Sequence, residues 1–95
     1  MVIGVMSATL ATPGIGSLKE KRSIVKGVIG RLQSRFNVSV SEVDHQDSKL
    51  VAVIGLAVVS NDGRFVEEQL DAVLNFMRHD GRFFVSHVER ETFGF

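Results

Sequence analysis

The sequence predicts a single α+β domain whose elements follow the order β-α-β-β-α-β, and three observations support this prediction. Four short runs rich in β-branched and apolar residues are separated by turn residues or by helical patterns. Two longer segments repeat apolar residues at three- and four-residue intervals, as amphipathic helices do. The chain has 95 residues, of which 44% are hydrophobic and 23% charged. That size and composition suit one globular domain, spanning residues 1–95, with one core.

The first half of the chain predicts a strand, a helix and a second strand. Residues 2–10 form an apolar run that ends at a turn containing the only proline. Ser17 is expected to cap the helix that follows, and Glu20, three residues later, completes a capping box. Apolar residues at helical spacing continue this helix to about Phe36. Residues 38–45 then alternate and predict a strand with limited burial.

The second half predicts a strand, a helix and a last strand. Residues 50–59 are apolar at every position except for a glycine, which indicates a central strand. A helical stripe follows from Val66 and ends near Asp80, and residues 83–91 form the final strand. Two β-α-β units with right-handed crossovers place both helices on one face of a four-stranded antiparallel sheet. This is the ferredoxin-like sandwich, with the first and third strands in its centre.

One face of this sheet is left open by the helices. The two central strands are aliphatic on both faces, so the open face predicts an apolar patch and homo-oligomer formation through it. Long side chains of outer segments, such as Arg82 or Arg90, are the alternative cover. Neither central strand carries an aromatic residue, which argues against RNA recognition by base stacking on the sheet.

Composition excludes several function classes. The chain has no cysteine, which excludes disulfides, thiolate chemistry and cysteine-bound zinc. No signal peptide is visible, and the apolar runs are too short to span a bilayer, so we expect a cytoplasmic protein without a membrane partner. No nucleophile–base pair or carboxylate pair can be placed, so we expect no enzyme activity, cofactor, metal or small-molecule substrate.

Charge is concentrated on the first helix. The net charge of the chain is zero, yet residues 17–36 carry six bases and one acid. Small residues occupy the outer face of this helix, and each glycine there costs about 1 kcal/mol relative to alanine, which predicts that a partner approaches closely. A basic rim beside small residues suits a phosphate backbone. The candidate contacts are the bases Lys19, Lys21, Arg22, Lys26, Arg31 and Arg35 and the small residues Ser23, Gly27, Gly30 and Ser34.

Two loops are further candidates. Gly14, Gly16 and Ser17 open the first helix, where free backbone N–H groups could hold an anion, although no Walker motif is present. The turn Asp44-His45-Gln46-Asp47 has carboxylates and an imidazole that could bind a divalent cation. Because Asp residues in turns usually bond their own backbone, we interpret it as a turn.

Three stretches together resemble the YlxP-like family of short bacterial proteins, which is classed as a domain of unknown function. They are Ser17-Leu18-Lys19-Glu20-Lys21-Arg22, Asn37-Val38-Ser39-Val40-Ser41-Glu42-Val43-Asp44-His45-Gln46-Asp47 and Val58-Val59-Ser60-Asn61-Asp62. The resemblance covers essentially the whole chain and implies a ferredoxin-like fold and a gene context near translation and ribosome-maturation factors. It supplies no catalytic residues. The apolar tail Phe93-Gly94-Phe95 departs from the expected pattern.

These observations favour a non-catalytic binding protein that associates with RNA or the ribosome through its basic first helix. The alternative is a homo-oligomeric protein-interaction module that binds no nucleic acid. A small enzyme is the third hypothesis and has the least support from the residues.

Overall fold

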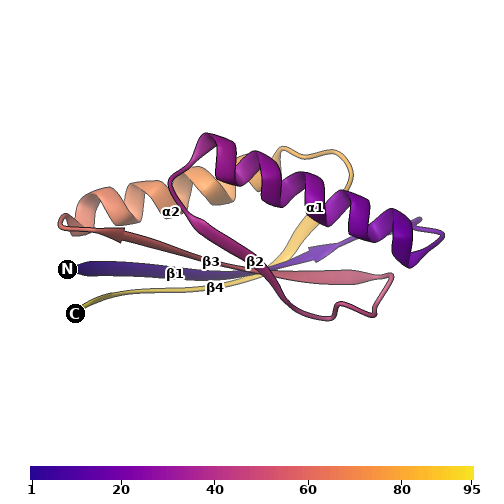
Figure 1. The fold of residues 1–95 in the computed structure, drawn as a ribbon, viewed down its shortest axis with the longest axis horizontal. Coiled ribbons are helices and arrows are strands. Elements are labelled where there is room, and N and C mark those ends of the chain that lie inside the picture. The colour runs from indigo at the N-terminus through magenta and orange to yellow at the C-terminus, as the bar shows by residue number, and fades with distance from the viewer.

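The computed structural model describes residues 1–95 and confirms the ferredoxin-like α+β fold. The strands form one antiparallel sheet in the order β2-β3-β1-β4, so the first and third strands are central as predicted. Both helices lie on the same face of the twisted sheet (Figure 1). The elements are β1 (Val2–Ala11), α1 (Leu18–Arg35), β2 (Ser39–Asp44), β3 (Val51–Ser60), α2 (Gly63–Arg78) and β4 (Phe84–Gly94).

Local hydrogen bonds set where the helices begin. The Ser17 hydroxyl accepts a hydrogen bond from the Glu20 backbone N–H at 3.1 Å, and Glu20 Oε2 accepts one from the Gly16 N–H at 3.2 Å. The predicted capping box therefore forms. Helix α2 begins three residues before its apolar stripe, because Asp62 caps it by accepting a hydrogen bond from the Arg64 N–H at 3.0 Å.

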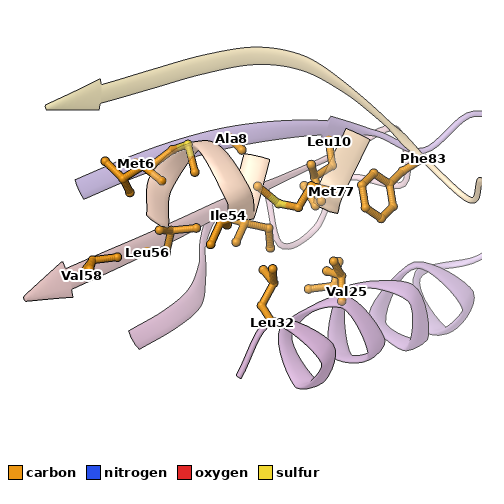
Figure 2. Packing of buried hydrophobic residues seen from close by; sticks show 14 of the residues in the cluster. Met6, Ala8, Leu10, Val25, Leu32, Ile54, Leu56, Val58, Met77 and Phe83 are labelled. Atoms are coloured by element: carbon orange, nitrogen blue, oxygen red, sulfur yellow. The ribbon is translucent and has the colours of Figure 1, made fainter. Parts of the chain in front are cut away.

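The core lies between the helices and the inner face of the sheet. It contains 15 buried hydrophobic residues: 14 come from alternate positions of the central strands and from one stripe of each helix, and the last is Phe83 in the loop before β4. Figure 2 shows Val25 and Leu32 of α1 pointing toward the sheet. Helix α2 packs closely on β1 at Gly4, where an added Cβ would lie 2.4 Å from Val66 Cγ1. A side chain at this position would push the helix away.

The last strand is longer than predicted, and the expected apolar tail is mostly strand. β4 continues to Gly94 because β1 offers it a pairing edge to the end, with Ile3 opposite Phe93. The Phe95 N–H donates to the Met1 carbonyl at 2.7 Å, so the ends of the two strands lie side by side (Figure 1). Neither helix is long and apolar enough to cross a membrane.

Candidate binding surfaces

Four of the six bases of α1, namely Lys19, Arg22, Lys26 and Arg35, are exposed and form no ion pair within the chain. Lys19, Arg22 and Lys26 lie three and four residues apart, so they share one side of the helix. We call these three residues the basic strip. Gly30 continues the same side toward the end of the helix. Because no acidic side chain of the chain neutralises them, their charge is available to a partner.

Lys21, by contrast, is completely buried and is not a surface contact. Its Nζ donates a hydrogen bond to the His45 carbonyl at 2.6 Å and lies 3.2 Å from Glu42 Oε2. That carboxylate oxygen is buried and accepts no well-aligned hydrogen bond. The expectation that Lys21 meets a partner is therefore corrected, because this lysine ties α1 to β2 and its following turn. Lys21 lies four residues before Val25, so both side chains point to the buried side of α1.

Arg31 is also engaged within the chain. Its guanidinium lies 2.7 Å from Asp80 Oδ2, and Arg82 binds the same carboxylate at 2.8 Å. These contacts join α1 to the loop between α2 and β4. Arg31 is only partly exposed, and its guanidinium already donates a hydrogen bond to Asp80, so fewer of its donors are free for a partner.

Arg35 packs against the second helix. Its guanidinium lies 4.8 Å from the centroid of the Phe76 ring, a cation–π arrangement. The Phe36 and Phe76 rings meet edge to face, with centroids 5.9 Å apart. Arg35 remains exposed, but its position is set by this contact between the ends of α1 and α2.

The small residues of the outer face have different surroundings. An added Cβ on Gly27 would lie 3.3 Å from Arg31 and 3.5 Å from Arg82, so part of the predicted close approach comes from the chain itself. Gly30 has no atom near its Cβ direction. Ser34 donates its hydroxyl to the Arg31 carbonyl at 3.1 Å, and Ser23 is exposed. Only Ser23, Gly30 and Ser34 are thus left for an outside partner.

The loop before α1 already holds an acidic group. Gly14 has a φ of 78°, which favours glycine, and the Gly16 N–H is bonded to the Glu20 carboxylate. The Glu20 carboxylate therefore occupies the position expected for an anion, and we do not propose Gly14, Gly16 and Ser17 as an anion-binding site.

The hairpin turn uses its polar groups locally. Asp44 Oδ1 accepts a hydrogen bond from the His45 N–H at 2.8 Å, and His45 adopts a φ of 58°. Across the chain, no three histidine, aspartate or glutamate side chains gather in a way that could hold a metal ion.

The open face of the sheet is an apolar surface with an acidic border. The strand pairing and the alternation of side chains assign it the following residues, which we call the open face: Ile3, Val5, Ser7, Thr9 and Ala11 of β1; Ser39, Ser41, Val43 and, past the irregularity in β2, Asp44; Val51, Val53, Gly55, Ala57 and Val59 of β3; and Phe84, His87, Glu89, Glu91 and Phe93 of β4. They include no lysine or arginine. Glu89 and Glu91 therefore give this face a negative charge.

Arg90, considered above as a cover for the open face, points to the opposite side. Its guanidinium binds Asp71 at 2.7 Å and Glu67 at 2.9 Å, both on α2. Burial alone would lower the pKa of Arg90, but the hydrogen bonds and charges of Asp71 and Glu67 outweigh it and raise that pKa. Arg82 is held by Asp80 in the loop before β4. The two arginines therefore leave the open face uncovered.

A shallow hollow of about 370 Å³ lies in the middle of the open face. Ser7 and Gly55 are paired across the central strands and form its low point, while Val5, Glu89 and Glu91 line its sides. Val43 of the neighbouring strand leans over Gly55, where an added Cβ would lie 2.8 Å from Val43 Cγ1. Val43 thus covers part of Gly55, and the hollow that remains beside it, above Ser7, leaves room for one side chain from outside.

The sequence reasoning missed the role of β4 in this surface. Phe84 and Phe93 are both exposed and lie opposite Ala11 and Ile3, so the border strand has an aromatic residue near each end. The two-residue alternation of Glu89, Glu91 and Phe93 is the signal that could have placed them on one face. The central strands do lack aromatic residues, as expected.

Comparisons with known proteins agree with the resemblance described above. A family model described as "Protein of unknown function (DUF503)" matches residues 3–90 of the chain. The "Uncharacterized protein YlxP" of Bacillus subtilis (strain 168) is 44% identical over 62 residues, which cover 65% of this chain and 67% of that protein.

Proposed function

Since the chain belongs to the DUF503 family of YlxP-like proteins, whose description assigns no activity, we propose a function from its surfaces. We propose that it is a non-catalytic RNA-binding protein that acts in the cytoplasm and contacts the phosphate backbone through the basic strip of α1. One observation carries the proposal: Lys19, Arg22 and Lys26 share one helix side and have no acidic partner within the chain. Exposed bases without partners are what phosphate contacts require.

The surroundings of the strip support a backbone contact. Gly30 and Ser23 lie beside it with little side-chain bulk, so a nucleic-acid strand can approach the helix closely. The open face of the sheet, which other proteins of this architecture use for stacking bases, carries Glu89 and Glu91 and would repel phosphates. RNA binding is therefore expected on the helix side, without strong preference for sequence. Ribosomal RNA is the preferred probe because of the gene context that the family resemblance implies.

A salt titration tests this proposal. The affinity for a short fluorescent single-stranded RNA and for ribosomal RNA is measured by anisotropy between about 50 and 200 mM salt. Three phosphate contacts predict a slope of roughly −2 for the logarithm of affinity against the logarithm of salt concentration on the single-stranded probe. Absence of binding at low salt, or a slope that stays unchanged when Lys19, Arg22 and Lys26 are replaced by glutamine, contradicts the proposal.

A homo-oligomeric interaction module without RNA binding is the competing function. The exposed apolar residues of the open face favour it. Light scattering on the full chain separates the two: a dimer that binds no RNA supports the competing function, and an RNA-binding monomer contradicts it.

A further inference from the structure

The open face has a chemistry that identifies its occupant. It combines an aliphatic centre, a hollow over Ser7 and Gly55, and two carboxylates on one border. Val43 of β2 and Phe84 and Phe93 of β4 are 56%, 56% and 40% exposed, so large apolar side chains face outward on both sides of the centre. An apolar surface of this kind usually marks an interaction site.

The dimensions of the face match one helix. Strands lie about 4.8 Å apart, so the two outer strands are separated by about 14 Å. A helix with its side chains is about 10–12 Å wide and would cover the central strands between them. The ten residues of β1 extend over about 33 Å, which a helix of about 20 residues spans.

Charge distinguishes the possible occupants. A second copy of the chain placed on this face brings either the border of β4, with Glu89, Glu91 and the imidazole of His87 that lies 3.6 Å from Glu89, or the border of β2, with its serines and Asp44. Neither border offers a lysine or an arginine. An RNA strand would bring more negative charge. A helix with lysine or arginine along one border would pair with both carboxylates while its apolar side covers the centre.

From these observations we infer that the open face binds a basic amphipathic helix of a partner protein. The apolar side of that helix packs on Val5, Val53 and Ala57, and one large apolar side chain enters the hollow above Ser7 and Gly55. Its basic border pairs with Glu89 and Glu91. This surface lies on the opposite side of the sheet from the basic strip (Figure 1), so both partners can be bound together.

A charge-swap experiment with two synthetic peptides tests the inference. One peptide has leucine and lysine at the spacing of an amphipathic helix, and the other has glutamate in place of every lysine. The wild-type chain should bind the lysine peptide roughly tenfold tighter than the glutamate peptide. Glu89→Lys with Glu91→Lys should reverse this preference. The double variant Asp47→Lys with Glu68→Lys, which changes the net charge equally at exposed positions off this face, should keep it.

Two further measurements keep the test decisive. Circular dichroism verifies that each variant is folded, and if the lysine variant unfolds, Glu89→Gln with Glu91→Gln should bring the two peptide affinities close together. Amide NMR signals of Val5 and Val53 should shift on addition of the lysine peptide. A peptide preference that ignores Glu89 and Glu91 overturns the inference. The inference is also overturned if the chain forms a stable dimer that Val53→Lys dissociates and that the lysine peptide does not disrupt. RNA binding by the basic strip is measured in a separate experiment, so a chain that binds no RNA would not change the outcome of the peptide experiment.

Discussion

The outer side of α1 and the open face of the sheet lie on opposite sides of one small domain and differ in how the chain treats charge. On the helix, Lys21 and Arg31 form ion pairs within the chain, while the basic strip is left without partners. On the sheet, Glu89 and Glu91 stand beside an aliphatic centre with no lysine or arginine on the same face, and His87 is the one imidazole there, 3.6 Å from Glu89. The difference shows that a neutral chain can carry two separate surfaces of opposite charge. It is also the basis on which we propose an anionic partner for the helix and a cationic, apolar partner for the sheet.

The largest expected effect separates the bases that hold the fold from those that are free. Lys21→Met leaves Glu42 without its partner in a mostly buried position, so we expect the free energy of unfolding to fall by about 3 kcal/mol. Urea unfolding measures it. Lys49→Met, at an exposed lysine, is the control and should change stability by less than about 0.5 kcal/mol. Equal losses in both variants would contradict the assignment of Lys21 as an internal anchor.

The next effect concerns the basic strip alone. Replacing Lys19, Arg22 and Lys26 by glutamine should lower the affinity for single-stranded RNA at low salt roughly tenfold or more and bring the salt slope near zero. Stability should stay nearly unchanged because all three side chains are exposed. The matched control also removes three charges, in Lys49→Gln with Arg64→Gln and Arg78→Gln, where all three side chains are exposed outside the strip. A similar loss of affinity in the control would assign RNA binding to the overall charge and not to the strip.

A smaller effect tests whether the bare side of α1 is kept for a partner. Gly30→Ala meets no neighbouring atom, so we expect it to stabilise the helix by about 0.5–1 kcal/mol. If RNA approaches the helix there, affinity should fall while stability rises. Thermal unfolding and anisotropy on the same variant give both values. Higher stability with unchanged RNA affinity would show that Gly30 has no part in binding.

The smallest effect is expected from the aromatic residues of the sheet border. Phe84→Ala with Phe93→Ala should leave RNA affinity unchanged, because the carboxylates between them repel phosphates. The same variant should weaken binding of the lysine peptide by shortening the apolar surface. Stacking of bases on these rings would instead cost about 1–3 kcal/mol for each base. If RNA affinity falls by that amount, RNA binds to the open face of the sheet, and the proposal that it binds to the basic strip is wrong.

The sequence was sufficient for the fold but only partly for the surfaces. Hydrophobic periodicity and the Ser17–Glu20 capping box determine the elements locally, and the right-handed crossovers then leave one topology. Lys21 was misplaced because its partners Glu42 and His45 are more than twenty residues away in the chain. The same applies to Arg31, whose partner Asp80 follows α2.

The sheet was harder to predict at its border than in its centre. The central strands are apolar at nearly every position, so their burial follows from composition. β4 mixes charged, polar and aromatic residues, and the face that each residue occupies depends on its pairing with β1 and on an irregularity between Thr9 and Leu10. The charge of the open face could therefore be assigned only once the register was known.

The pairing of β4 with β1 also has a consequence for how the domain is made. β1 is synthesised first and β4 last, so one edge of β1 stays unpaired until almost the whole chain has emerged. Such long-range pairing slows folding and exposes an aliphatic strand edge in the meantime. The strand that closes this edge is also the one that carries Glu89 and Glu91. The acidic border of the open face is therefore complete only once β4 has paired with β1.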